Sequence, residues 1–404
     1  MRTSKFFAFN ILAAIAAAQP FSISKREVAS GDNSTVTLAT TSNNDFQTSY
    51  GKPFAIFKPK VFIVSMFELE RDPWLEALDF AHNITIPGLS PIYSTIYCTT
   101  NYTICQATAG EGEINAASSL TALTLNPLFD LSKTYWLLAG ISGGEPTQVT
   151  TGSATFAKYA IQVGLQYQID YRDYINTDPN WLTGYIPYGA DNPYSYPGNV
   201  YGTEVFELNE KLRDRALELA SSVELDNGTA KNEEFRQLYK EEAATSPPAV
   251  VGCDVLTSDN YFTGNVLNDY FANLTKLMTN GSATYCSTAQ EDNASLEVFT
   301  RMEKYGLIDY ERIVVLRTIS NFSRPPPSMA NDTVKFFTDT DKGGIGHSLT
   351  NLVNAGFPFI HDVISHWDDV YESGEKYKAE NYLGDIFGTL GGKPDFGKDS
   401  FEVA

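Results

Sequence analysis

The chain has 404 residues, and its 49 acidic and 29 basic side chains give a formal net charge of −20 at pH 7. A surface of this charge repels nucleic acids and anionic membranes, which argues against nucleic acid as a partner and does not disfavour a neutral small molecule. The length allows one large α/β domain or two small ones.

The N-terminus is typical of a secretory signal peptide. Arg2 and Lys5 precede an apolar run that begins at Phe6 and ends in three alanines, the order of charged, apolar and small residues that such signals share. The apolar run of about 13 residues is too short to span a bilayer of roughly 30 Å. We therefore interpret residues 1–18 as a cleaved signal peptide rather than as a signal anchor.

The residues after the signal are polar. Lys25 and Arg26 form a dibasic site of the kind that secretory-pathway proteases read, so 19–26 is a candidate propeptide. Residues 27–57, rich in Ser, Thr and Asn over most of their length, predict a flexible arm. No uninterrupted apolar stretch of 18 residues follows the signal, so we expect no membrane insertion of the mature chain.

Nine Asn-X-Ser/Thr sequons follow the signal peptide, which predicts a glycosylated protein that is secreted or held in the cell wall. The sequons at Asn293 and Asn321 fall inside motifs of a candidate ligand site, and a role of Asn321 in that site requires a bare side chain. Glycans are expected at the other seven, which are Asn33, Asn83, Asn101, Asn227, Asn273, Asn280 and Asn331.

Four cysteines in an oxidising compartment favour two disulfides. Cys98 and Cys105 flank a short polar segment between two β-rich runs, which predicts a bridge across a hairpin. Cys253 and Cys286 would then form the second bridge. Buried free thiols are the alternative.

Hydrophobic patterns predict alternating strands and helices along the remainder of the chain. Strands are predicted over 58–66, 92–98, 103–110, 134–140, 248–258 and 311–320, with one or two more within 154–170. Helices are predicted over 68–81, 112–125, 203–223 and 291–305, with two helix starts at 343–351 and 358–369. Such alternation indicates an α/β fold with a mostly parallel sheet covered by helices.

Six segments resemble the nucleoside phosphorylase and nucleosidase superfamily: KVFIVSMFELE, GEGEINAASSLTAL, LLAGISGG, VLTSDNYF, QEDNA and VVLRTISN. Within it the chain is most similar to the fungal purine nucleoside permease family, whose members carry segments like YGTEVFELN at 201–209 and QEDN at 290–293. The resemblance covers 58–390 and implies one domain over 58–404. It further implies a three-layer sandwich with a mixed, mostly parallel central sheet.

The resemblance implies roles for two polar residues. Glu291 matches the position whose carboxylate accepts hydrogen bonds from the 2′- and 3′-hydroxyls of ribose, and its alternative is a solvated acid in the first turn of a helix. Asp292 beside it is interpreted as a structural acid at that helix start. Asn321 matches a position at which an Asp or Asn stabilises the departing purine. Its alternatives are a turn residue at a strand end or a glycan site.

The same resemblance places other residues around the base. Tyr261 and Phe262 match positions that stack on the purine, although both could equally be packing residues. Gly140, Ser142 and Gly143 would form the wall along the base.

The glycine-rich stretch after 134–140 raises the question of phosphate, because exposed N–H groups of such a turn can bind an anion. Phosphorylases of this superfamily carry an Arg and a Ser where this chain has Leu138 and Ile141, and neither can donate a side-chain hydrogen bond. Nucleosidases are apolar there and use a Glu to polarise water, which matches Glu70. The resemblance thus favours hydrolysis, while Arg71 or Arg317 serving an anion would favour phosphorolysis.

Taken with the resemblance, these residues predict a secreted enzyme that hydrolyses purine nucleosides such as adenosine, guanosine or inosine. The alternatives are a nucleoside-binding protein that supports uptake, a phosphorylase, and a storage or structural protein on the same fold. No cofactor is expected. No metal ion is expected either, because the four histidines show no metal-ligand spacing apart from a loose His361–His366 pair, and no cluster of Cys and His suggests zinc. The sequence leaves the number of subunits open, with a homo-oligomer as one arrangement.

Overall fold

The computed structural model describes residues 55–174, 181–338 and 342–397. The signal peptide, the candidate propeptide and nearly all of the predicted arm lie outside the described residues. The arm was predicted to end at residue 57, but the N–H groups of Ile56 and Phe57 already donate to the carbonyl oxygen of Leu128 at 3.0 and 2.9 Å. The folded domain therefore begins slightly earlier than the sequence pattern indicates.

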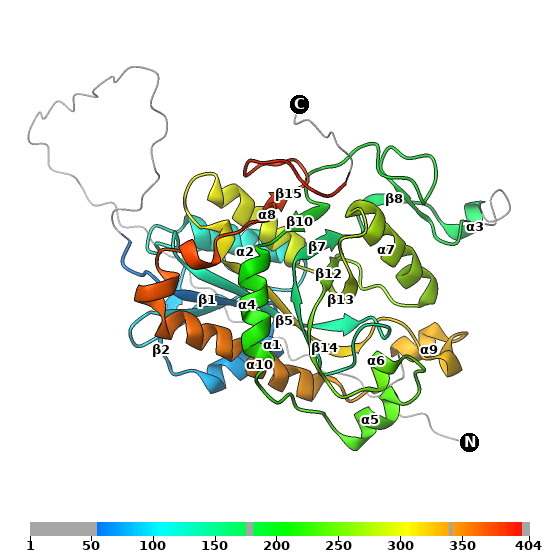
Figure 1. Cartoon of the computed structure of the whole chain (residues 1–404), viewed down its shortest axis with the longest axis horizontal. Coiled ribbons are helices and arrows are strands. Elements are labelled where there is room, and N and C mark those ends of the chain that lie inside the picture. The colour runs from blue at the N-terminus through cyan, green and yellow to red at the C-terminus, as the bar shows by residue number, and fades with distance from the viewer. Residues whose placement is uncertain (1–54, 175–180, 339–341, 398–404) are drawn as a thin grey trace, which may run out of the picture. The chain divides into compact units, whose positions relative to one another are not determined.

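The centre of the sheet consists of long parallel strands (Figure 1). β1 (Val61–Ser65) runs parallel to β4 (Ile104–Thr108) on one side and to β5 (Tyr135–Gly144) on the other. β5 also runs parallel to β14 (Ile313–Phe322). These strands are near-continuous apolar runs because both faces of the sheet are covered.

A second parallel group contains β7 (Tyr159–Gln162), β12 (Asp254–Thr257) and β13 (Tyr285–Ala289). β13 meets the tip of β5 in an antiparallel pair between Ser287 and Gly144. Other strands join the same sheet, most of them through antiparallel pairs: β2 (Phe80–Thr85), β3 (Thr95–Thr99), β6 (Ala154–Ala157), β10 (Val205–Glu207), β11 (Val250–Gly252) and β15 (Gly384–Asp385).

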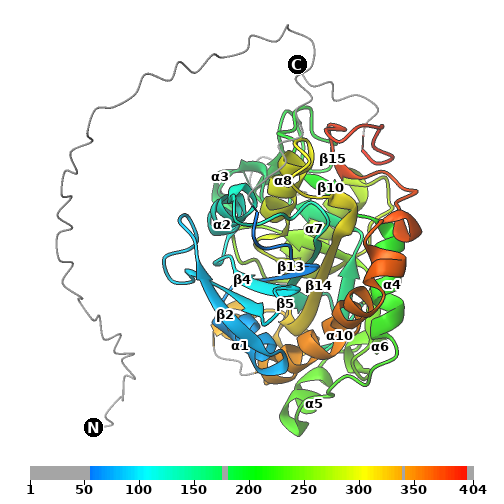
Figure 2. The same cartoon turned by 90° about the vertical axis from the view of Figure 1, so that its left-hand side faces the viewer.

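Helices cover both faces of this sheet, and Figure 2 shows the two layers on either side of the strands. One face carries α2 (Glu113–Leu125) and α8 (Asp292–Glu303). The other face carries α1 (Glu68–Ala77), α4 (Glu210–Ala220) and α10 (Ile345–Ser365). The predicted α/β class and its three layers, with a mixed sheet that is parallel at its centre, are confirmed.

Smaller elements lie around these layers. α7 (Asn265–Met278) packs on β7 and β12 through side chains on the face opposite α8. The other elements are a two-stranded sheet and short helices: β8 (Gln166–Gln168), β9 (Tyr185–Pro187), α3 (Tyr171–Tyr174), α5 (Ala230–Arg236), α6 (Glu242–Thr245) and α9 (Thr333–Thr338).

The helix predicted over 203–223 is wrong in its first part. β10 occupies 205–207, where three consecutive buried residues pair with β7. The helix α4 begins only after Asn209, whose side chain accepts a hydrogen bond from the backbone N–H of Leu212 and so caps the helix. The predicted cap at Thr203 is therefore also wrong.

Three other boundaries differ from the sequence pattern. The strand predicted over 248–258 is divided into β11 and β12, which pair with different neighbours. The segment 154–170 forms three strands rather than one or two. The two helix starts predicted at 343–351 and 358–369 belong to the single helix α10, because buried apolar residues on both sides of Pro358 keep one packing face.

Six of the seven asparagines predicted to carry glycans lie in the described residues, and all six are exposed. Asn33 lies outside the described residues. By contrast, Asn293 is buried, and its side-chain amide donates to the carbonyl oxygen of Thr203 at 2.8 Å. Its sequon is therefore inaccessible in the folded chain.

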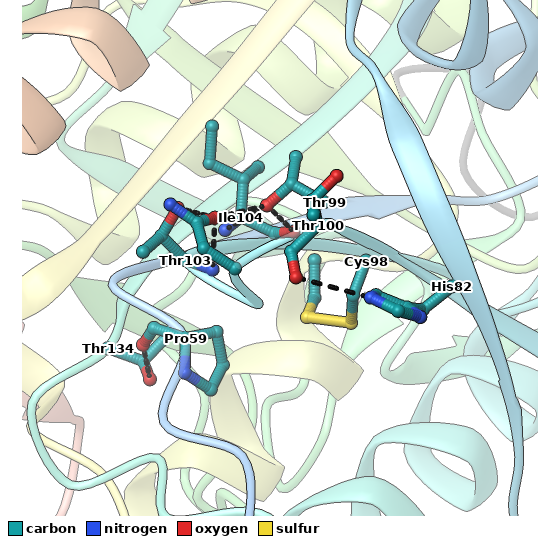
Figure 3. The surroundings of a disulfide bond; sticks show 10 residues. Pro59, His82, Cys98, Thr99, Thr100, Thr103, Ile104 and Thr134 are labelled. Atoms are coloured by element: carbon teal, nitrogen blue, oxygen red, sulfur yellow. Dashed lines mark hydrogen bonds between the residues drawn. A yellow bond between two sulfur atoms is a disulfide. The ribbon is translucent and has the colours of Figure 1, made fainter.

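Both predicted disulfides are present. Cys98 and Cys105 face each other across the β3–β4 hairpin, whose turn is held by hydrogen bonds between Thr99 and Ile104 (Figure 3). Cys253 and Cys286 lie in a small buried cluster next to β12 and β13. The second bridge thus ties the junction between β11 and β12, where Cys253 lies, to β13, which contains Cys286.

We expect the two bridges to contribute unequally to stability. They span sequence separations of 7 and 33 residues, and loop-closure entropy then gives about 2.5 and about 3.7 kcal/mol at 25 °C. Replacing Cys253 and Cys286 by Ala should lower the free energy of unfolding by about 1 kcal/mol more than replacing Cys98 and Cys105. Denaturant titration of both double variants measures this, and an equal or reversed order would contradict it.

Candidate functional site

A cavity of about 240 Å³ opens beyond the carboxyl end of β1. β5 separates from β1 after the pair Val64–Leu138, and its tip turns toward β13 at Gly144. Ligands bind in such crevices at the carboxyl ends of parallel strands. The cavity is lined by seven of the eight residues predicted for catalysis and substrate binding: Glu70, Ser142, Gly143, Tyr261, Phe262, Glu291 and Asn321.

The glycine-rich stretch at this cavity is a strand and not the turn that the sequence indicates. β5 continues to Gly144, and its register with β14 extends over the glycines. The N–H of Ile141 donates to Glu70 Oε1 at 2.7 Å, and the N–H of Gly143 donates to Thr288 Oγ1 at 3.0 Å. These two N–H groups are therefore already used within the protein. The side chain of Leu138 is buried in the core and does not line the cavity.

Glu70 enters the cavity from the first turn of α1 and is 2% exposed. Its Oε2 accepts a hydrogen bond from the N–H of Met66 at 2.8 Å, while its Oε1 accepts the bond from Ile141. Burial raises the pKa of Glu70 to about 8, although the positive charge of Arg317 lowers it. A carboxylate with this pKa is a stronger base than a solvent-exposed one.

Arg317 lies in the middle of β14 and is surrounded by acidic groups. Its Nε donates to Asp292 Oδ2 at 3.2 Å, and its Nη2 donates to Asp292 Oδ1 at 2.5 Å and to Glu291 Oε2 at 3.3 Å. Glu291 also accepts the N–H of Gly112 at 3.0 Å. Burial raises the pKa of Glu291, which Arg317 and this N–H oppose.

Gly140 does not line the cavity, contrary to its predicted place in the wall along the base. It lies behind the charged groups instead, because a Cβ at this position would meet Arg317 Nη1 at 2.5 Å and Glu70 Oε1 at 2.6 Å. The absence of a side chain is what allows Glu70 and Arg317 to approach β5.

Replacing Gly140 by Ala should destabilise the protein by about 1–3 kcal/mol, since the added carbon forces two buried charged groups to move. Gly346 in α10 is a matched control, because a Cβ there has nothing within 4 Å. Gly346→Ala should be neutral or stabilise by up to about 1 kcal/mol. Thermal unfolding of both variants measures the difference, and equal effects would contradict the packing argument.

The other end of the cavity is less charged. The side-chain Nδ2 of Asn321 donates to the phenolic oxygen of Tyr261 at 3.0 Å, which leaves the phenolic proton and the amide Oδ1 for a ligand. Phe262 packs edge-on against Phe271 of α7 and lines the wall. The hydroxyl of Ser142 is buried at the cavity and finds no hydrogen-bond partner among the described residues.

A β-bulge explains the position of Asn321. The register between β14 and β5 shifts after Ile319, so that Asn321 pairs with Gly143. In a regular strand successive side chains point to opposite faces, but here both Ser320 and Asn321 line the cavity. Gly143 leaves room for this arrangement, since a Cβ there would lie 3.1 Å from Asn321 Oδ1.

The family profile described as purine nucleoside permease matches residues 58–376. The chain belongs to the purine nucleoside permease family. A purine nucleoside permease of Candida albicans is 70% identical over 367 residues, which are 91% of this chain and 90% of that protein. A probable purine nucleoside permease of Schizosaccharomyces pombe is 39% identical over 322 residues, or 78% and 91% of the two chains.

Two solved structures are also similar to this permease-family chain. Futalosine hydrolase of Helicobacter pylori is 17% identical with a TM-score of 0.42, over 74% of this chain and 97% of that one. A 5′-methylthioadenosine/S-adenosyl homocysteine nucleosidase of Campylobacter jejuni is 14% identical with a TM-score of 0.45, over 76% and 98%. The family assignment rests on the sequence relatives alone.

Two features are absent from the described ranges 55–174, 181–338 and 342–397 of this chain. In these ranges no helix is both long and apolar enough to cross a membrane. Over the same residues, no group of three or more His, Cys, Asp or Glu side chains could hold a metal ion.

The sequence alone did not predict the ion pair between two residues at this site, Arg317 and Asp292. Arg317 was considered only as an alternative anion ligand, and Asp292 only as a structural acid. A signal for the pair exists, because an arginine inside the apolar strand IVVLRTIS must have a buried acidic partner. The sequence does not say which acid that is, since the partner lies 25 residues away.

Proposed function

We propose that this protein binds purine nucleosides in the cavity and hydrolyses their N-glycosidic bond to give free purine and ribose. The proposal rests on one observation: the cavity has buried carboxyl groups at one end, and an amide and a phenol at the other. This matches the two halves of a nucleoside, whose sugar carries hydroxyl donors and whose base carries both donors and acceptors.

Glycosidic cleavage passes through a positively charged, oxocarbenium-like sugar and needs a base for the attacking water. Glu291 would accept hydrogen bonds from the ribose hydroxyls, while Arg317 and the N–H of Gly112 hold its carboxylate in place. Glu70 would take a proton from water as the water oxygen bonds to C1′ and the bond from C1′ to the purine nitrogen breaks, and the departing purine would take up a proton from solvent. Asn321 and Tyr261 would form hydrogen bonds to the departing purine.

The charges of the site favour water over phosphate. Of the described residues that line the cavity, Arg317 is the only one with a positively charged side chain. It already forms ion pairs with Asp292 and Glu291. Arg71, the other candidate for an anion, pairs with Asp72 and does not line the cavity. A phosphate dianion would face Glu70 and Glu291 without a free counter-charge, and such repulsion is strong where water is excluded.

We also propose that the protein acts outside the cell, in the medium or the cell wall. The N-terminal signal pattern supports this, as do two disulfides and six exposed sequons.

The names of the relatives, which are called permeases, favour a second candidate function. In this alternative the protein binds nucleosides and transfers them to a separate membrane carrier.

Incubation of the purified protein with adenosine, guanosine and inosine separates the two candidate functions. The proposal predicts release of free purine that increases linearly with time and with protein concentration. Saturable binding by calorimetry without purine release would refute the hydrolase and favour the binding protein. Absence of both binding and release would refute the nucleoside site itself.

A further inference from the structure

The buried end of the cavity holds more negative than positive charge. Glu70, Glu291 and Asp292 are each at most 4% exposed, and Arg317 is 2% exposed. One cation thus faces three carboxyl groups in a region from which water is largely excluded. Buried charges persist only when they are paired or neutralised by a proton.

The three acids interact with Arg317 to different extents. Asp292 binds the guanidinium through two nitrogens, and Glu291 binds it through one longer bond at 3.3 Å. Glu70 instead uses its two oxygens for the backbone N–H groups of Met66 and Ile141. Its carboxyl group interacts with the guanidinium electrostatically, through space.

We propose that Asp292 is a positioning residue that controls the basicity of Glu70 through Arg317. Asp292 does not line the cavity and so touches no substrate. By binding the guanidinium in a fixed plane it neutralises charge that would otherwise hold Glu70 ionised. The inference rests on the proposed function, in which Glu70 accepts the proton of the attacking water.

The surroundings of Glu70 agree with this assignment. The charged groups that act on its carboxyl are Arg317, which favours ionisation, and Glu291, which opposes it; the N–H groups of Met66 and Ile141 also favour ionisation. Arg317 in turn faces Asp292, Glu291 and Glu70. Burial raises the pKa of Glu70 more than the through-space charge of Arg317 lowers it.

The test is Asp292→Asn, which keeps the size of the side chain and removes its charge. Arg317 then acts more strongly on Glu70, and the pKa of Glu70 should fall by about one unit or more. The acid limb of the pH profile of kcat/KM should move to lower pH by the same amount, because the base is ionised over a wider range. Infrared titration of the buried carboxyl band, assigned by its loss in Glu70→Gln, measures the same shift without turnover.

Asp309→Asn is the matched control. Asp309 accepts a hydrogen bond from Arg312 Nε at 2.7 Å, and neither residue lines this cavity. This variant should leave both titrations unchanged. An Asp292→Asn protein whose Glu70 titrates as in the wild type would overturn the inference.

The double variant Asp292→Asn/Arg317→Gln decides the question if Asp292→Asn does not fold. Removal of both charges should leave the pKa of Glu70 within about half a unit of the wild type, since the two charges already offset each other. A rise of more than about one unit in the pKa of Glu70 would show that Asp292 does not offset the effect of Arg317 on Glu70, and would overturn the inference. A wild-type protein without purine release would instead refute the proposed function, while the infrared titration would still decide the role of Asp292.

Discussion

Glu70→Gln is expected to reduce the turnover of purine nucleosides by about a hundredfold or more, the contribution of a well-placed general base. Glutamine keeps the shape of the side chain, and its carbonyl oxygen can accept one of the two N–H groups, of Met66 or of Ile141, that the two carboxylate oxygens of Glu70 accept. It cannot take a proton from water. Single-turnover measurement of purine release, with saturating nucleoside, isolates this step from binding.

Glu68→Gln is the control for this prediction. Glu68 lies two residues earlier in the same helix but is exposed, and its carboxylate accepts a hydrogen bond from Tyr93 rather than facing the cavity. Its turnover should match the wild type. The pH profile gives a further check, because Glu70 must be ionised to act and its pKa is about 8. Activity should therefore fall as the pH decreases below about 8, and retention of full activity by Glu70→Gln would exclude Glu70 as the base.

Asn321→Ala is expected to reduce turnover by about a hundredfold, the scale reported for loss of one preorganised hydrogen-bond donor. The variant removes the amide that bonds to Tyr261 and leaves the base end of the cavity without this polar contact. Folding should change little, because Asn321 is only partly buried at the end of β14. Steady-state kinetics together with thermal unfolding separates the two effects.

Asn199→Ala serves as the control for Asn321, since Asn199 is exposed and does not line the cavity. It should have wild-type turnover. If Asn321→Ala were folded and fully active, Asn321 would have no part in stabilising the departing purine. A purely structural role would instead lower the unfolding temperature and leave the turnover of the folded fraction unchanged.

The sequence predicted those features that depend on local pattern. Long apolar runs predicted β1, β5 and β14, and the spacing of cysteines around a short turn predicted the Cys98–Cys105 bridge. Similarity to a family predicted which distant residues line one cavity. That similarity was needed because Glu70 and Asn321 are separated by most of the chain and meet only in the folded sheet.

The features that were missed depend on tertiary contacts. The glycines after Leu138 continue β5, since pairing with β14 and β13 outweighs the local preference of glycine for a turn. The position of Asn321 requires a bulge whose register shift no local pattern indicates. The binding of Arg317 by Asp292 depends on the packing of the start of α8 against β14, which are distant in the sequence pattern.

The products of the reaction test the central claim most directly. The protein should be incubated with inosine in buffers with and without phosphate, and the sugar product identified by mass spectrometry. The account predicts free ribose at a rate that does not depend on phosphate. The reason is that Arg317, the only cationic side chain among the described residues that line the cavity, already forms ion pairs with Asp292 and Glu291. Ribose 1-phosphate as the main product, with a rate proportional to phosphate, would contradict it.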